Sequence, residues 1–316
     1  MHMSKKLAIT SSPHIRSSIT TRQIMQEVCL ALIPAGIASV IYFGIDSLKI
    51  IAISVITCVL TEFLYQKLTN QKITVGDWSA VVTGLLLAYN LPATVPLWIP
   101  VVGSIIAILL VKQLFGGIGS NFMNPALTAR AVLFVSWGGI MGSYPMTRYM
   151  TDAVSSSTPL QQLADGASTV NVMDLLIGNC GGTLGETCKI ALILGGVYLI
   201  VRGIIDWKIP AAFIGTVFVM YLLTGGFSFG LALREILAGG LMLGAFFMAT
   251  DYATSPQSDL GRIIMGVGCG LICFIIRAYA NYPEGCSFAI LFMNVMTPLI
   301  DRFTMPKYFG EVKTHG

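Results

Sequence analysis

The chain has 316 residues, of which 55% are hydrophobic and only 11% are charged, and its mean hydropathy is +0.78. A soluble domain carries about 25% charged residues, so this composition excludes an ordinary soluble globular protein. The net charge of +4 comes from Lys and Arg residues scattered between apolar blocks. That pattern argues against binding to nucleic acid and favours loops at a membrane face.

Ten apolar blocks follow a polar segment, 1–26. Most approach the length of about 17–25 residues that a helix needs to cross the hydrocarbon core. The first five cover approximately 27–44, 48–68, 78–92, 95–114 and 122–140, and the second five 187–203, 209–225, 233–250, 262–280 and 285–303. A polar segment, 141–186, separates the two sets, and a polar tail, 305–316, ends the chain. The sequence therefore predicts an all-α, polytopic membrane protein with about ten transmembrane helices.

Basic residues are divided unevenly between the two sides that ten spans would create. With the N-terminus in the cytoplasm, 13 of the 19 Lys and Arg residues fall on the inner side. They are Lys5, Lys6, Arg16, Arg22, Lys67, Lys72, Lys112, Arg202, Lys208, Arg262, Arg302, Lys307 and Lys313. Because cytoplasmic loops carry an excess of basic residues, we expect both termini in the cytoplasm and the segment 141–186 outside it.

The two sets of apolar blocks resemble each other. Segment 26–29 parallels 185–188, segment 86–90 parallels 247–251, and segment 119–122 parallels 285–288. Two repeats with an odd number of spans each must have opposite orientations in the membrane. We therefore expect inverted five-helix repeats, 27–140 and 187–304. The alternative is that apolar blocks of low complexity align by chance.

Three polar interruptions lie inside or beside the apolar blocks, at 89–92, 116–125 and 250–256. Non-helical backbone at membrane depth is tolerated only where protein or a cavity covers it. In repeat-built membrane proteins such breaks mark ligand or ion sites. The alternative is that they are loops just outside the membrane.

Few ionisable residues occur within the blocks: Glu62, Asp251, Arg130 and Arg277. A charge inside the membrane usually pairs with another or lines a pathway, so Glu62 is a candidate ion-path residue. A shift of one helical turn would instead place Glu62 at the membrane interface.

Cysteine spacing predicts packing more than chemistry. Cys269 and Cys273 share one helix face, but no His or second Cys pair accompanies them as metal ligands would require. Cys180 and Cys188 flank a Gly-rich loop and could pair if that loop is extracytoplasmic.

The long polar segment contains a Ser-rich stretch, 152–160, that closes with Thr158 and Pro159. Thr is favoured at a helix N-cap and Pro at the first helical position, so a short helix is expected to begin here. No nucleophile with a neighbouring His and no phosphate-binding loop occurs in the sequence. From the residues alone, the chain is a two-halved membrane protein with polar breaks.

Four segments extend this interpretation: 11–14, 112–126 (K-Q-x-x-G-G-x-G…N-P-A), 182–187 (G-x-L-G-E-T/S) and 247–251 (F-M-A-T-D). In these segments, spread over nearly the whole length, the chain resembles the NqrB/RnfD family. Its short N-terminus is closer to the RnfD branch. The resemblance implies a subunit of an Rnf-type complex, which transfers electrons between ferredoxin and NAD and moves Na⁺ or H⁺ across the bacterial inner membrane.

The resemblance also implies two flavins. In this family, FMN is joined through a phosphoester bond to a threonine in a D-x-x-S/T-G-A-T pattern, whose positions Asp152, Ser155 and Thr158 match here. Small serines, Ser156 and Ser157, replace the usual Gly and Ala. The rival Thr169 lacks an aspartate six residues earlier.

A non-covalent riboflavin is the second expected cofactor, and the candidate binding residues are Asn121, Asn124 and Asp251 in the polar breaks. The expected partners are the other membrane and peripheral subunits, including a second covalent-flavin subunit and iron–sulfur subunits, together with a flavin transferase. Two other classes fit the pattern: a transporter or channel with inverted repeats and no redox role, and a structural subunit whose flavin loop is vestigial.

Overall fold

The computed structural model describes residues 19–145, 147, 158–165, 170–280 and 284–305. Within these ranges the chain forms helices and no strand, which confirms the all-α prediction. The helices are α1 (Thr21–Phe43), α2 (Ile45–Leu68), η1 (Val75–Asp77), α3 (Ser79–Tyr89), α4 (Trp98–Ile105), η2 (Ile106–Gln113), α5 (Pro125–Ser136), α6 (Gly138–Met141), α7 (Pro159–Ala164), α8 (Val172–Ile177), α9 (Lys189–Val201), α10 (Lys208–Thr224), α11 (Phe229–Leu237), α12 (Leu241–Leu243), η3 (Gly244–Met248), α13 (Asp259–Tyr279) and α14 (Cys286–Thr304).

Every apolar block contains a helix, but the helices differ in length. Four of them, α1, α2, α13 and α14, are long and apolar enough to cross a membrane, and the bent pair formed by α11 and α12–η3 makes a fifth. Five shorter apolar helices of 10–17 residues account for the other blocks. The structure is therefore that of a multi-pass membrane protein.

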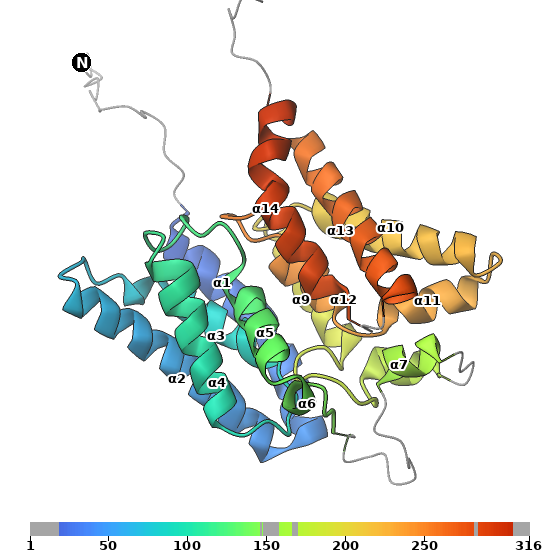
Figure 1. Cartoon of the computed structure of the whole chain (residues 1–316), viewed down its shortest axis with the longest axis horizontal. Helices are drawn as coiled ribbons and strands as arrows, with labels where there is room; N and C mark the ends of the chain where they lie inside the picture. The colour runs from blue at the N-terminus through green and yellow to red at the C-terminus, as the bar shows by residue number, and fades with distance from the viewer. Residues whose placement is uncertain (1–18, 146, 148–157, 166–169, 281–283, 306–316) are drawn as a thin grey trace, which may run out of the picture.

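The two halves of the chain form two groups of helices that meet along α1 and α9 (Figure 1). Gly195 of α9 lies against the backbone of α1, where a Cβ would collide with the carbonyl oxygen of Ala31. Small residues allow close approach of helices in membranes, where packing replaces the hydrophobic effect as the main source of association. The central contact thus depends on a glycine.

The bent helix of the second half breaks between Leu237 and Leu241, with an angle of 68°. Carbonyl groups at the C-terminal end of α11 are satisfied by two buried cations. Arg277 donates to the carbonyls of Glu235 (2.8 Å) and Ala238 (3.3 Å), and Lys189 donates to that of Gly239 (2.9 Å). Cations are favourable at this end of a helix because its unpaired carbonyls carry partial negative charge.

A second break follows α3, and part of the long polar segment covers it. The amide of Gly185 donates to the carbonyl of Tyr89 (2.9 Å), and that of Leu184 donates to the carbonyl of Leu91 (3.0 Å). Residues 182–187 are all buried. The segment predicted as an outer loop therefore enters the helix bundle and satisfies backbone groups that the membrane could not.

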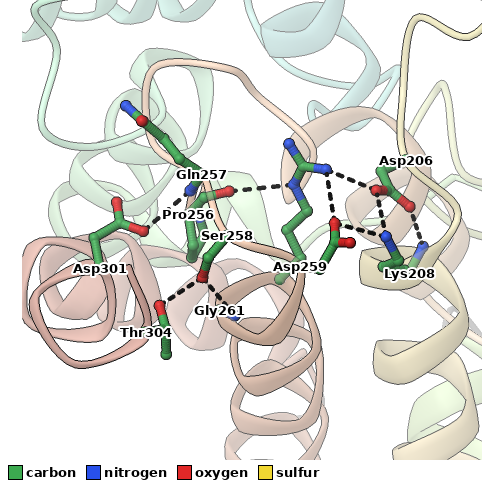
Figure 2. A network of polar contacts seen from close by, with 10 residues as sticks. Asp206, Lys208, Pro256, Gln257, Ser258, Asp259, Gly261, Asp301 and Thr304 are labelled. Carbon is green, nitrogen blue, oxygen red and sulfur yellow. Dashed lines mark hydrogen bonds and ion pairs between the residues drawn. The ribbon is translucent and has the colours of Figure 1, made fainter. Parts of the chain in front are cut away.

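A polar network joins the ends of α10, α13 and α14 (Figure 2). Arg262 pairs with Asp206 (2.7 Å), and Lys208 pairs with Asp259 (2.6 Å). Ser258, the N-cap of α13, donates to Thr304 near the end of α14 (2.6 Å). These contacts fix the relative positions of three helix ends.

Candidate functional site

Thr158 caps the short helix α7. Its side chain accepts a hydrogen bond from the amide of Gln161 (3.2 Å), and Pro159 occupies the first turn. The expected N-cap is thus confirmed. Asp152, Ser155 and the rival Thr169 lie outside the described residues.

The half-buried Thr158 borders a cavity of about 20 Å³, which is large enough for one water molecule. Glu186, Thr187 and Lys189 also line it. Lys189 is buried and donates to the carbonyl of Glu186 as well as to that of Gly239. A buried lysine and a buried glutamate therefore share this small cavity with the threonine that the resemblance marks for FMN.

A much larger cavity, of about 330 Å³, lies between the two halves of the chain. Helices α1 and α3, η2, η3 and the loops before α5 and after η3 contribute to its wall. Its volume falls within the range of roughly 300–1,000 Å³ that is typical of small-molecule sites. Asn121, Asn124 and Asp251, the three residues predicted for riboflavin, all line this cavity.

The three predicted residues are held by contacts across the two halves. The amide nitrogen of Asn121 donates to a carboxylate oxygen of Asp251 (3.4 Å) and to the carbonyl of Met123 (3.1 Å). Asn124 caps α5 through its side-chain oxygen and donates through its nitrogen to the carbonyl of Met248 (3.3 Å). The structure therefore brings together residues that are 130 positions apart.

The loop before α5 gives the cavity part of its cover. Gly116, Gly117 and Gly119 have φ angles of 113°, 91° and 82°, a region that residues with a Cβ rarely adopt. This backbone turns the chain sharply after η2, and Ile118 and Gly119 then line the cavity. The positive φ angles thus explain why glycine occupies these positions of the K-Q-x-x-G-G-x-G segment.

An ion pair that the sequence did not predict lies beside the large cavity. Lys112 binds both carboxylate oxygens of Glu62, at 2.8 Å and 3.1 Å, and donates to the hydroxyl of Ser79 at 2.6 Å. Glu62 and Lys112 are only 1% and 3% exposed. Lys112, near the end of the block 95–114, was counted from the sequence among the cations on the cytoplasmic side, but its side chain is buried inside the bundle.

Other buried charges also pair across the fold. Arg130 of α5 binds Glu284 and donates to Asn90 (3.1 Å) and Ser287 (2.6 Å), and Arg277 lies 3.9 Å from Glu235. Sequence reasoning identified both arginines as lying within spans but missed their partners. All seven cysteines are unpaired, so Cys180 and Cys188 do not form a disulfide.

The residues around the large cavity combine apolar walls with a few polar groups. Ile24, Leu86, Phe246 and Phe247 supply apolar walls, while Asn121, Asp251, Ser79 and Lys112 supply polar groups. This mixture of apolar surface and few polar groups is what small-molecule sites generally present. Among the described residues, no cluster of His, Cys, Asp or Glu has the arrangement of a metal site.

Comparisons with known proteins agree with these features. A model described as the NQR2, RnfD, RnfE family matches residues 8–310. A protein from Acetobacterium woodii, named as part of a Na⁺-translocating ferredoxin:NAD⁺ oxidoreductase complex, is 51% identical over 97% of this chain and 96% of its own. A protein from Clostridium ljungdahlii, named as part of a proton-translocating ferredoxin:NAD⁺ oxidoreductase complex, is 42% identical over 96% of each chain. A Halorhodospira halophila protein, named as part of an ion-translocating oxidoreductase complex, is 33% identical, again over 96% of each chain. The chain belongs to the NQR2, RnfD, RnfE family.

Proposed function

We propose that this chain is the flavin-carrying membrane subunit of an ion-translocating ferredoxin:NAD⁺ oxidoreductase complex. The similarity to members of such complexes extends over nearly the whole chain. The observation that carries the proposal is the large cavity, in which Asn121, Asn124 and Asp251 converge from both halves. The proposed partners are the other membrane and peripheral subunits, including a second covalent-flavin subunit and iron–sulfur subunits, and a flavin transferase.

The proposed topology has ten spans in two inverted repeats, with both termini in the cytoplasm of a bacterial inner membrane. Contacts between the halves support it. The parallel segments pair Asn90 with Asp251 and Asn121 with Ser287. A two-fold axis between the repeats would therefore turn the contact of Asn121 with Asp251 into a contact of Ser287 with Asn90. In the structure Arg130 bridges Ser287 and Asn90. Reciprocal contacts of this kind are expected of a two-fold arrangement.

Two flavins would have different attachments in this arrangement. FMN would be joined to Thr158 by a phosphoester, with Asp152 and Ser155 in the recognition pattern, and riboflavin would occupy the large cavity. The flavins would supply the electron-transfer chemistry, whereas the protein supplies binding, orientation and electrostatics. Thr158 provides a hydroxyl group fixed at a helix start, and the cavity provides apolar walls and a few polar groups for a second carrier.

The ion that is moved is Na⁺ or H⁺, and the relatives' names include both. Glu62 is the proposed ion-path residue, since a carboxylate this deeply buried in a membrane protein usually pairs or lines a pathway. Its partner, Lys112, lines the large cavity.

Fluorescence of the denatured subunit on a gel tests the covalent flavin. Membranes containing wild type, Thr158→Ala and Ser228→Ala are compared after expression with the flavin transferase. Ser228 caps α11 as Thr158 caps α7, so its variant controls for loss of a helix cap. We expect a fluorescent band in wild type and Ser228→Ala and none in Thr158→Ala. No band in any sample would contradict the covalent-flavin proposal and favour a transporter or channel without a redox role.

Release of non-covalent flavin tests the large cavity. We expect denatured wild-type complex to release riboflavin and a variant carrying Asn121→Leu and Asp251→Leu to release much less. Asp46→Leu is a suitable control because that carboxylate is exposed and pairs with Lys49. Equal release from all samples would place the riboflavin elsewhere.

A further inference from the structure

The buried pair of Glu62 and Lys112 connects the large cavity with the interior of the first helix group. Glu62 lies on α2, Lys112 on η2 and Ser79 at the start of α3. Lys112 and Ser79 line the cavity. Glu62 is not among the lining residues, so the ammonium group stands between the cavity and the carboxylate.

Lys112 is the one cation among the described residues that line the cavity, and Asp251 is the one acid. Lys112 also interacts electrostatically with Asp251. The ammonium group therefore contacts one carboxylate, that of Glu62 on α2, and shares the cavity wall with a second, that of Asp251 in the loop after η3. The hydroxyl of Ser79, which accepts from Lys112, in turn donates to the carboxylate of Asp77 (2.5 Å).

A lysine can change partners more readily than an arginine. Its ammonium group has three equivalent donors at the end of a flexible four-carbon stem. Two of its contacts go to Glu62 and one to Ser79, and no backbone carbonyl in the described part of the chain binds it. The wide turns of η2, in which Lys112 lies, are characteristic of helices that are locally distorted at functional sites.

We propose that Lys112 couples electron arrival in the cavity to cation binding at Glu62, an inference that rests on the proposed function. If a neighbouring carrier of the complex gives up one electron to a flavin held in the cavity, that flavin would gain one negative charge, and the ammonium group of Lys112 would be drawn toward it. Glu62 then lacks its counter-charge and binds one cation from the aqueous phase. One negative and one positive charge enter together. Na⁺ would be held by the carboxylate without a covalent bond, whereas H⁺ would form an O–H bond with Glu62 that breaks when the proton is released. Departure of the electron restores the ion pair and releases the cation.

The physical basis is the cost of an uncompensated charge in the low-dielectric interior. A buried carboxylate that loses its partner is strongly destabilised unless another cation replaces it. In the resting state, Lys112 is the counter-charge of Glu62, so binding of a free cation there brings no gain in electrostatic energy. The state of the cavity thus decides which cation Glu62 holds.

Cation binding to the oxidised complex tests the coupling without any redox turnover. In Lys112→Met the carboxylate of Glu62 lacks its internal cation, and we expect it to bind Na⁺ or H⁺ at least about tenfold more tightly than wild type, a difference of about 1.4 kcal/mol. Glu62→Gln and the double variant Lys112→Met/Glu62→Gln should show no such gain. Lys49→Met removes an exposed lysine and is the matched control. Binding is measured with radioactive Na⁺ and, for H⁺, by proton uptake at fixed pH.

A redox titration of the non-covalent flavin provides the second measurement. We expect its potential in wild type to rise with the concentration of the coupling cation, and this dependence to disappear in Glu62→Gln. Unchanged cation binding in Lys112→Met, or an unchanged dependence in Glu62→Gln, would overturn the proposal. If Lys112→Met does not fold, the wild-type and Glu62→Gln titrations decide the question. A complex without flavin in the cavity would refute the riboflavin site of the proposed function, whereas the binding measurement would still report on the Lys112–Glu62 pair.

Discussion

Removing Arg130 should weaken the contact between the two halves of the molecule. Arg130 belongs to the first half, while its partners Glu284 and Ser287 belong to the second. The side chains of Arg130 and Glu284 are 6% and 16% exposed. Arg130→Met keeps much of the apolar stem but leaves Glu284 without its counter-charge and Asn90 without a donor.

The expected loss of stability follows from this burial. Breaking a buried ion pair by removing one partner costs about 3–5 kcal/mol, and the partial exposure of Glu284 favours the lower end, about 3 kcal/mol. Replacing both partners, in Arg130→Met/Glu284→Gln, leaves no unpaired charge. The double variant should therefore be more stable than the sum of the single losses predicts, by about 1–3 kcal/mol.

Denaturant unfolding of the purified protein in detergent, followed by loss of helical circular dichroism, measures these differences. Lys49→Met is the control, because the Lys49–Asp46 pair is exposed at 53% and 63% and should contribute less than about 1 kcal/mol. A cost for Arg130→Met no larger than that of Lys49→Met would refute the reasoning. Strict additivity in the double variant would do the same.

Two further predictions concern packing and pH. A Cβ at Gly84 of α3 would lie 2.7 Å from the Cα of Val55 in α2, so Gly84→Ala should destabilise the protein by about 1–3 kcal/mol. Gly215→Ala in α10, where nothing lies within 4 Å, should not; equal denaturant midpoints for the two variants would contradict the prediction. Partial burial raises the pKa of Asp206, but hydrogen bonds from the Lys208 amide and Arg262 outweigh it and hold that pKa below its ordinary value. The resulting stabilisation is present above the unfolded value of about 3.9 and is lost as pH falls through the lower folded value. The free energy of unfolding should therefore fall less steeply with falling pH in Asp206→Asn than in wild type. An identical pH dependence in both proteins would show that the hydrogen bonds to Asp206 do not stabilise the fold.

Much of the fold and part of the site follow from local sequence signals. Long apolar blocks require helices, and the Thr158–Pro159 pair predicts the start of α7 because both residues have specific roles at a helix N-terminus. The polar breaks predicted Asn121, Asn124 and Asp251 as riboflavin-binding residues, and the structure places all three around one cavity. Their binding of riboflavin stays a prediction.

Features that depend on distant contacts could not be predicted in the same way. The break between α11 and α12 lies inside an apparently continuous apolar block, and its carbonyls are satisfied by Arg277 and Lys189 from other helices. The entry of segment 182–187 into the bundle depends on the backbone that α3 leaves unpaired. Lys112 was counted among the cations on the cytoplasmic side, and its pairing could not be predicted because its partner, Glu62, lies 50 residues away.

The most direct test of the account is fragment mass spectrometry of the protein isolated from cells that contain the flavin transferase. The account predicts that fragments containing Thr158 are heavier by one FMN less one water, and that those containing Thr169 without Thr158 have their unmodified mass. An added mass on Thr169, or no added mass on any fragment, would contradict the assignment of the flavin to Thr158.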